Sequence, residues 1–232
     1  MILAAGRGER MRPLTDVTPK PLLPVGGQPL IVHTLRRLAA AGFTEVVINI
    51  AHLGEQIVAC LGDGAGLGLA IRYSPEPPGA LETAGGVANA LPLLGADPFL
   101  VINGDIFCDW DLARARRALR PEYDALLLLV DNPPQHTDGD FNLVAGRITD
   151  SGGERLTYAG VGVFRPQLFA TVARGARAPL APLLRQACAA GRLGGEHHRG
   201  LWRDVGTPQR LAALDAELQT RRRRPGAAAG AC

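Results

Sequence analysis

The sequence predicts an α/β protein, a single domain built around a mainly parallel sheet. Apolar segments of strand length alternate with amphipathic segments of helix length through the first half of the chain. That alternation requires crossover helices between parallel strands, and it places ligand sites where those strands end. With 232 residues, 47% of them hydrophobic, the chain is long enough to bury one large core.

The first expected strand, residues 1–5, runs into a loop rich in glycine and arginine. Gly6 and Gly8 let backbone N–H groups approach an anion closely, and Arg10 adds positive charge beside them. Lys20 stands between two prolines and is the one lysine in a chain otherwise supplied with arginine. Because an ammonium is a compact charge on a flexible stem, it can follow a phosphate that moves during a reaction. The stretch 1–24 therefore predicts a phosphate site.

Two common phosphate-binding loops do not fit this stretch. A Walker A loop needs Gly-x-x-x-x-Gly-Lys followed by Ser or Thr, and the chain has none. A dinucleotide fingerprint needs a third glycine, where Met11 stands, and an acidic residue closing the second strand, where the sequence reads Ile50-Ala51-His52. The Gly-x-Gly-x-Arg loop followed by Pro-Lys-Pro indicates a different kind of phosphate site.

The next elements keep the alternation of strand and helix. Ile31, Leu35 and Leu38 share one face of a helix that ends at Gly42. The β-branched run EVVINI is typical of a strand. The elements expected in this part are a helix over 29–41, a strand over 45–50, a helix over 53–61 and a strand over 71–74.

A proline-rich segment, 75–79, leads from that strand into small residues that begin a helix reaching Leu91. Small residues at a helix start let a flat ring lie against the backbone, whose free N–H groups can bind carbonyl oxygens of the ring. Glu76 could bind such a base, or it could equally well belong to an ordinary proline-rich segment that leads into a helix without binding anything. The segment is therefore a candidate site for a planar base.

The apolar strand 99–102 ends in Asn103-Gly104-Asp105. A carboxylate on a glycine turn at a strand end points into the crevice, and a hard oxygen ligand suits Mg²⁺ that bridges phosphates. The alternative is an aspartate that only forms the turn. Asp109 and Asp111 are expected to cap a helix over 112–119.

The second half of the chain predicts strands folded over the crevice. A buried strand over 125–130 precedes polar, turn-rich sequence, which we interpret as short antiparallel strands. Asp140 and Asn142 flank Phe141 and would point to one side of a strand, spaced to bind sugar hydroxyls. Gly160 would let a sugar press against the backbone of a strand. The remaining expected elements are a strand over 158–164 and helices over 179–190 and 208–218.

The charge distribution excludes a nucleic-acid surface on the folded part of the chain. The formal net charge of +3 includes four consecutive arginines at 221–224, so the remainder carries −1. Residues 221–232, rich in arginine, glycine and alanine, are expected to form a disordered tail. The folded domain is then expected to span residues 1–220.

Cysteine usage and hydropathy point to the cytoplasm. The four cysteines lack the spacing of a zinc site or a disulfide framework, which is typical of a reducing compartment. No signal peptide is expected, and no apolar run approaches the roughly 20 residues of a membrane span. His197 and His198 would face opposite ways on a strand, so we interpret both as surface residues rather than metal ligands.

Five segments resemble the signature of the nucleotide-sugar pyrophosphorylases, which join a nucleoside triphosphate to a sugar 1-phosphate. They are LAAGRGERMRPLT, PKPLLPVGGQPLI, LETAGG at 81–86, NGD at 103–105 and WRDVGT at 202–207. The resemblance covers nearly all of the chain before the terminal arginines. It implies a single-domain, Rossmann-like (GT-A-like) three-layer α/β sandwich with a mainly parallel mixed sheet and a small antiparallel subsheet that binds the sugar.

The resemblance also implies a role for each matching residue. Arg10 and Lys20 are the implied catalytic residues, and Asp105 and Asp204 are the implied ligands of Mg²⁺, although Asp204 could instead cap the last helix. The implied nucleotide-binding residues are Ala4, Ala5, Gly6, Gly8, Glu9, Arg10, Lys20, Glu76, Thr83 and Gly85. The implied sugar-binding residues are Asn103, Asp140, Asn142 and Gly160. The expected partners are small-molecule substrates, without nucleic acid or membrane, and the expected state is a monomer or small homo-oligomer.

The resemblance extends to short, single-domain bacterial members that join UTP to N-acetylmuramate α-1-phosphate in cell-wall recycling. The alternatives are an enzyme that uses glucose or mannose 1-phosphate with UTP, dTTP or GTP, and a regulatory subunit that binds a nucleotide sugar without catalysis. The chain departs from the family at 147–157, where many relatives have Glu-Lys-Pro. It has Arg147 and Arg155 there but no lysine, so the contact to the sugar phosphate is left unassigned.

Overall fold

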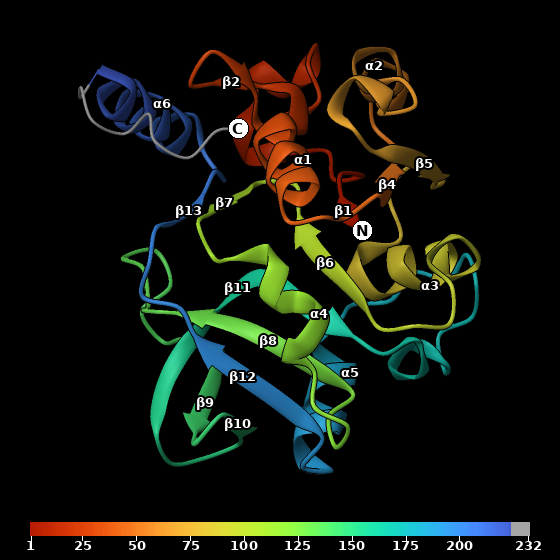
Figure 1. The fold of residues 1–232 in the computed structure, drawn as a ribbon, viewed down its shortest axis with the longest axis vertical. Coiled ribbons are helices and arrows are strands. Elements are labelled where there is room, and N and C mark those ends of the chain that lie inside the picture. Colours follow the sequence, from red (N-terminus) through yellow and green to blue (C-terminus); the bar gives the residue numbers. More distant parts are fainter. Residues whose placement is uncertain (224–232) are drawn as a thin grey trace.

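The computed structural model describes residues 1–223 and forms an α/β fold around one nine-stranded sheet (Figure 1). The strand order is β5-β4-β1-β6-β11-β8-β12-β10-β9. These strands are β1 (Ile2–Leu3), β4 (Glu45–Ile50), β5 (Ala70–Pro75), β6 (Phe99–Asn103), β8 (Ala125–Val130), β9 (Phe141–Val144), β10 (Arg147–Thr149), β11 (Glu154–Phe164) and β12 (Leu193–His197). Two small sheets pair β2 (Pro24–Val25) with β3 (Gln28–Pro29), and β7 (Ile106–Cys108) with β13 (Trp202–Asp204).

Helices connect and cover the strands. They are α1 (Leu30–Ala40), α2 (Gly54–Leu61), α3 (Glu82–Leu94), α4 (Ala115–Ala118), α5 (Ala181–Ala189) and α6 (Pro208–Arg223). Strands β5, β4, β1 and β6 are parallel neighbours, as the alternation of strand and helix predicts. Their carboxyl ends therefore meet at one edge of the sheet.

The sheet is mixed, as predicted, but it is not mainly parallel, because five of its nine described strand pairings are antiparallel. Strand β11 is antiparallel to β6, β8 and β9, and β10 is antiparallel to β9 and β12. Antiparallel neighbours need only short turns, whereas parallel ones need a crossover, and the turn-rich sequence between β8 and β11 supplies such turns. The antiparallel strands also do not form a separate subsheet, since β9 and β10 continue the main sheet and β9 pairs back onto β11.

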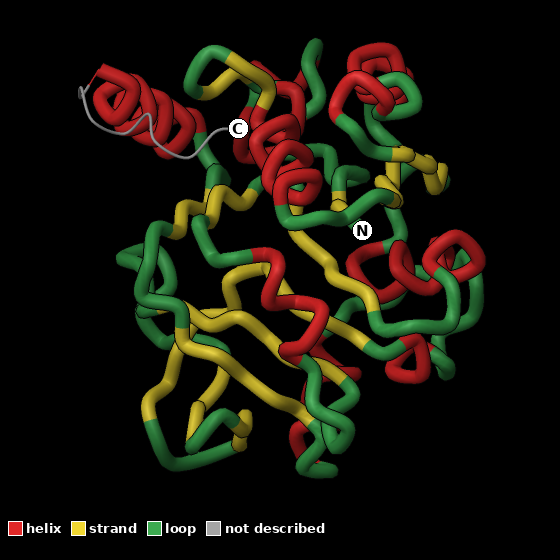
Figure 2. The backbone as a smooth tube through the Cα atoms, in the orientation of Figure 1, coloured by secondary structure: helices red, strands yellow, loops and turns green. Residues whose placement is uncertain are grey.

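Apolar side chains alternate between the two faces of the sheet and form two hydrophobic clusters, each with helix side chains. Figure 2 shows the helices in red around the yellow strands. In β4, Val46 and Ile48 belong to the hydrophobic cluster that contains side chains of α1 and α2. Val47 belongs to the opposite cluster, with side chains of α3 and α5. The period of two along the strand therefore buries successive residues under different helices. Each such fully buried aliphatic side chain contributes about 1.5–3 kcal/mol to stability.

Helix α6 continues beyond the predicted end of the domain. Arg221 forms an ion pair of 3.0 Å with Glu217 one turn earlier, which supports the last turns of the helix. Residues 221–223 are thus helical rather than part of a disordered tail, and the rest of the predicted tail, 224–232, lies outside the described residues. The expected helix over 112–119, in contrast, is shorter than predicted. It consists of a 3₁₀ turn at 112–114 followed by the short helix α4.

Leu214 of α6 is buried with Val25, Leu30 and Val205, so the helix packs near β2 and α1 (Figure 1). Among the described helices, none combines the length and the apolar character needed to cross a membrane.

Candidate active site

A cavity of about 290 Å³ lies at the carboxyl ends of the four parallel strands β1, β4, β5 and β6. We call it the lysine cavity. Eight of the predicted nucleotide- or metal-binding residues line it: Ala4, Ala5, Gly6, Gly8, Lys20, Glu76, Thr83 and Asp105. Predicted residues that come after β1, β5 and β6 are therefore brought to one cavity, whereas no predicted residue comes from β4.

Lys20 and Asp105 lie in direct contact inside this cavity. The Nζ atom of Lys20 donates a hydrogen bond of 2.5 Å to Oδ2 of Asp105. Only 12% of the Lys20 side chain and 29% of the Asp105 side chain is exposed to solvent. The ammonium is thus held at the carboxylate rather than aimed at bulk water. A partly buried ion pair of this kind interacts more strongly with a charged ligand than an exposed pair would.

Gly8 brings the first loop close to Lys20. Its φ of +70° is in the left-handed region, which glycine adopts without steric cost. A Cβ atom there would lie 3.1 Å from Cγ2 of Thr15 and 3.4 Å from Cβ of Lys20. The hydroxyl of Thr15 donates to the Gly8 carbonyl at 2.9 Å. The loop is therefore folded back onto the lysine by contacts that a larger residue at position 8 would disturb.

Asn49, which the sequence analysis did not identify, connects the strands around the cavity. Its Oδ1 accepts a hydrogen bond of 2.7 Å from the backbone N–H of Ala4, and its Nδ2 donates to Glu76 at 2.6 Å. The other oxygen of Glu76 accepts from the N–H of Leu81 at 2.8 Å. One network thereby joins the ends of β1, β4 and β5 to the start of α3. The sequence did contain a signal for this role of Asn49, because it is a polar residue among the apolar residues near the end of the strand EVVINI.

Replacing Asn49 by alanine is expected to destabilise the protein by about 2–4 kcal/mol, because it leaves a buried amide N–H and a carboxylate oxygen without partners. It is also expected to raise KM for the nucleotide, since Glu76 then no longer holds its loop. Urea denaturation and initial rates measure the two effects. Asn89→Ala is the matched control, because Asn89 makes only longer bonds of 3.2 Å at the edge of α3. Equal losses in both variants would contradict the proposed role of the network.

A second cavity of about 640 Å³ adjoins the first, and we call it the arginine cavity. Glu82, Thr83 and Asn103 line both cavities, so the two spaces share one wall. Arg155 of β11 and Arg185 of α5 line only the second. Arg147, the other arginine in the region where relatives have a lysine, lines neither. The further lining residues are Asp140, Phe141, Thr149, Asp150, Tyr158, Pro179, Leu180, Ala181, Leu184 and Cys188.

The predicted sugar-binding residues are only partly in this cavity. Asn103 and Asp140 line it, but Asn142 does not. Gly160 lies behind Asn103 instead: a Cβ atom there would be 2.7 Å from Nδ2 of Asn103. Gly160 therefore makes room for the Asn103 side chain and does not form the cavity wall.

Three predicted nucleotide-binding residues do not line either cavity. Arg10 and Glu9 are exposed on the first 3₁₀ turn, and Glu9 forms ion pairs with neighbouring arginines. Gly85 was expected to offer a free N–H to a base, which is wrong, because that N–H donates to the carbonyl of Ala178 at 3.0 Å. A Cβ atom at Gly85 would lie 2.3 Å from the Ala176 carbonyl, so the residue serves close packing.

Asp204 reaches the neighbourhood of Asp105 through the backbone. It lies on β13, which pairs with β7, and the N–H of the next residue, Val205, donates to the Asp105 carbonyl at 2.9 Å. The Asp204 carboxylate accepts a hydrogen bond of 2.8 Å from Arg210. It does not cap α6, where the hydroxyl of Thr207 accepts from the Arg210 N–H instead. Two acidic residues far apart in sequence are thus brought close together through the backbone, each beside a cation.

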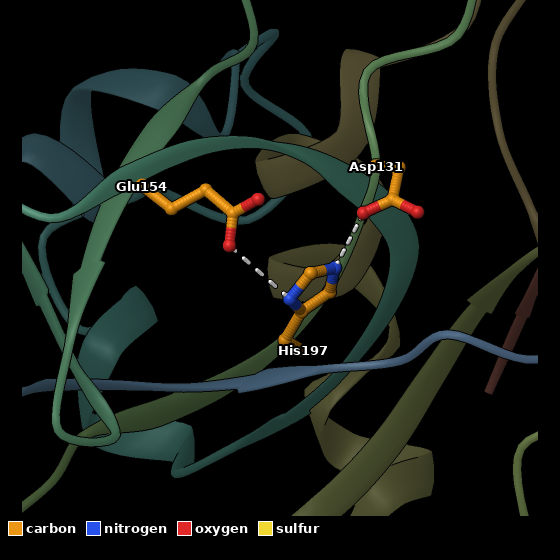
Figure 3. A group of neighbouring side chains, drawn as sticks. All are labelled: Asp131, Glu154 and His197. Carbon is orange, nitrogen blue, oxygen red and sulfur yellow. Dashed lines mark hydrogen bonds and ion pairs between the residues drawn. The ribbon is translucent and has the colours of Figure 1, made fainter.

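His197 is not the surface residue that we expected, since only 9% of its side chain is exposed. Figure 3 shows the ring between two carboxylates, at 2.8 Å from Asp131 and 3.6 Å from Glu154. His198 turns the other way and contacts Asp109 at 2.8 Å. None of these side chains lines either cavity. The cluster connects the ends of β8 and β12 to the start of β11 and lies apart from the candidate active site.

The α/β fold and the two adjoining cavities are typical of an enzyme that binds two substrates. A comparison with known protein families identifies the class of enzyme. Residues 1–146 match the family described as Nucleotidyl transferase, and the chain belongs to that family. The family predicted from the five sequence segments is therefore confirmed.

Individual proteins with similar sequences or structures indicate which members of the family this chain resembles. The chain is 55% identical over 222 residues to the N-acetylmuramate alpha-1-phosphate uridylyltransferase of Neisseria meningitidis serogroup B, covering 93% of this chain and 96% of the relative. It is 38% identical to the enzyme of the same name from Caulobacter vibrioides, covering 94% and 96%. A solved structure described as a putative glucose-1-phosphate thymidylyltransferase from Bacillus anthracis in complex with a sucrose superposes with a TM-score of 0.82 at 25% identity, covering 94% of each chain.

Proposed function

We propose that this chain joins UTP and N-acetylmuramate α-1-phosphate to give UDP-N-acetylmuramate and pyrophosphate. The observation that carries this proposal is the identity of 55% to the Neisseria relative over almost the whole of both chains. Such a reaction would serve the recycling of cell-wall sugars. Because UTP is made and used in the cytoplasm, we expect the enzyme to act there.

The geometry supports a two-substrate reaction. We assign the lysine cavity to the nucleoside triphosphate and the arginine cavity to the sugar 1-phosphate, because their shared wall lets two phosphates meet. Thr83 and Asn103 in that wall are polar side chains for which no hydrogen bond to a described residue is recorded, so they are available to substrates. The fold is of the Rossmann-like (GT-A-like) kind, with helices on both faces of the sheet and substrates at its carboxyl edge.

The mechanism that this arrangement favours is direct in-line displacement. A phosphate oxygen of the sugar 1-phosphate attacks the α-phosphorus of UTP, a new P–O bond forms, and the bond to pyrophosphate breaks. The nucleophile is already an anion, so no general base is needed. Two obstacles remain. The negative charges of the two phosphates repel each other, and the attacking oxygen must be aligned with the α-phosphorus. Lys20 reduces the first obstacle by neutralising charge at the α-phosphate, and the backbone at Gly6 and Gly8, which lines the cavity, holds the outer phosphates. Arg10 is exposed outside the cavity, so its part in the reaction requires the side chain to turn toward the bound nucleotide.

Mg²⁺ fits the chemistry of the donors at the centre of this site. Asp105 lies in the turn between β6 and β7 and lines the lysine cavity, and Asp204 lies outside both cavities on β13, beside that turn. Both supply hard carboxylate oxygens, which is the ligand type this ion prefers. These two residues would hold the ion, which would supply charge neutralisation for the phosphates. Without it, Lys20 and Arg210 balance the charge of the two carboxylates.

The second candidate is a nucleotidyltransferase for glucose or mannose 1-phosphate with UTP, dTTP or GTP, which the similarity to the Bacillus structure favours. A non-catalytic regulatory subunit is disfavoured, because Lys20 and Asp105 are in contact within the cavity.

The test is a pyrophosphate-release assay of four nucleoside triphosphates against N-acetylmuramate, N-acetylglucosamine, glucose and mannose 1-phosphates, with Mg²⁺ in every reaction. We expect the highest kcat/KM for UTP with N-acetylmuramate α-1-phosphate. A higher value for glucose or mannose 1-phosphate would transfer the assignment to the second candidate. Nucleotide-sugar binding without turnover for any pair would support the regulatory alternative.

A further inference from the structure

We propose that Arg155 and Arg185 bind the lactyl carboxylate of the acceptor sugar and so select N-acetylmuramate over N-acetylglucosamine. The inference rests on the proposed function. N-acetylmuramate differs from N-acetylglucosamine by a lactyl ether, which adds one carboxylate at the side of the ring. A site that distinguishes the two needs a cation within reach of that group and away from the phosphate.

The two arginines of the arginine cavity have no acidic partner. Glu82 pairs instead with Arg177 at 2.8 Å, and Asp140 contacts His136 at 3.0 Å and accepts from the N–H of Tyr158 at 2.8 Å. Among the described residues, neither Arg155 nor Arg185 forms an ion pair, and Arg185 has no recorded hydrogen bond either. Three carboxylates line the cavity as well, so the two guanidinium groups select an anion by direct contact and not through a net positive charge of the cavity.

Asp150, the third acidic residue of the cavity wall, is contacted by a thiol rather than by an arginine. The Sγ atom of Cys188 lies 3.4 Å from Oδ1 of Asp150 and 3.6 Å from the Ile148 carbonyl. Burial, assisted by the nearby Asp150 charge, raises the pKa of the Cys188 thiol to about 11. The thiol therefore stays protonated at neutral pH and can donate to Asp150, whose carboxylate forms no ion pair with either arginine among the described residues.

The register of β11 places Arg155 at the end of the cavity remote from the reaction. Gly160 lies against Asn103, which belongs to the wall shared with the lysine cavity. Arg155 stands five residues before Gly160 on the same strand, about 16 Å away at the rise of an extended chain. Its backbone therefore lies beyond the position that the reacting phosphate must occupy near Asp105. A sugar that spans the cavity from the shared wall would present its lactyl group toward this end.

The side chains are suited to a carboxylate. The Nε atom of Arg155 donates to the Asp138 carbonyl at 2.7 Å, which fixes the plane of the guanidinium and leaves its Nη atoms for a ligand. Arg185 approaches from α5, one residue after the buried Leu184 that anchors that helix in the core. Guanidinium groups bind carboxylates through paired N–H donors, which gives directional selection as well as charge.

The test compares N-acetylmuramate α-1-phosphate with its lactyl carboxamide, which has nearly the same shape but no charge. For the wild-type protein with UTP, we expect kcat/KM to be on the order of 10- to 100-fold higher for the acid, as for a hydrogen bond to a charged group. R185Q should lower kcat/KM for the acid by a similar factor, mainly through KM, and leave the value for the carboxamide unchanged. R155Q should act in the same direction. R147Q, the same substitution on β10 outside both cavities, should change neither value.

Several outcomes would overturn the proposal. If R185Q lowered kcat/KM equally for the acid and the carboxamide, the arginine would bind the phosphate or stabilise the fold instead. Thermal melting distinguishes these two cases, because only a structural role lowers the melting temperature. Equal values of kcat/KM for the acid and the carboxamide in the wild-type enzyme would show that no cationic side chain binds the lactyl carboxylate. If N-acetylmuramate α-1-phosphate were inactive while another sugar phosphate reacted, the proposed function would fail first, and the carboxylate assignment with it.

Discussion

Replacing Lys20 by alanine is expected to lower kcat by about 10²–10³, the effect of removing one preorganised charged donor from a developing negative charge. Lys20 is held in the lysine cavity by Asp105 and is largely shielded from solvent. Among residues 1–223, no other cationic side chain lines that cavity, so none of them is placed to replace its charge. Single-turnover measurements of pyrophosphate release with saturating UTP report the chemical step directly.

Lys20→Arg is the informative companion variant. It keeps the positive charge but replaces a compact ammonium with a planar guanidinium in a confined position, so we expect only partial recovery of kcat. Thermal melting controls for folding. Lys20→Arg should melt close to the wild type because it keeps a cation beside Asp105, whereas Lys20→Ala should melt at a lower temperature because the partly buried Asp105 carboxylate loses its partner. Turnover close to that of the wild type in the alanine variant would remove Lys20 from the chemistry.

Replacing Asp105 by asparagine is expected to abolish the Mg²⁺-dependent activity and leave the fold intact. The amide has the shape of the carboxylate and can still accept a hydrogen bond from Lys20, but it lacks the charge that holds a divalent cation. The loss should exceed that in Lys20→Ala, because the site then lacks the ion's charge as well as a correctly oriented lysine. Titration of Mn²⁺ into the protein with UTP, followed by electron paramagnetic resonance, measures ion binding without relying on turnover.

Asp109→Asn is the matched control for that variant. Asp109 lies four residues further along the chain, contacts His198 at 2.8 Å and lines neither cavity, so its substitution should leave ion binding and activity unchanged. Unfolding of Asp105→Asn would favour a structural role for Asp105. Retained Mg²⁺-dependent activity would show that the metal ligands lie elsewhere.

Much of the lysine cavity was predictable because its residues follow strands whose order is set by a general rule. Parallel strands connected by crossover helices end at the same edge of a sheet, so Gly8, Glu76 and Asp105 could be placed together before the structure was known. The rule does not specify side-chain partners. Asn49 was missed for that reason: its hydrogen bonds to Ala4 and Glu76 depend on the register of β4 against its neighbours.

The arginine cavity was less predictable, because its walls come from segments with no local relation to each other. Periodicity assigns Arg185 to the solvent side of α5, next to the inward Leu184. Nothing in the local pattern indicates that β11 passes opposite this helix. Gly85 was misassigned for the same reason: its N–H is free in the local helix but is used by the chain near Ala178.

The sequence by itself determined the family, the parallel half of the sheet and the convergence of Lys20 with Asp105, since these follow from local motifs and from the handedness of crossover connections. The tertiary structure decided how many strand pairings are antiparallel, the Asn49 network and the placement of Arg155 and Arg185 in one cavity. Those features depend on which distant segments pack together. Packing is set by the shape and volume of the whole core, and no short stretch of sequence contains that information.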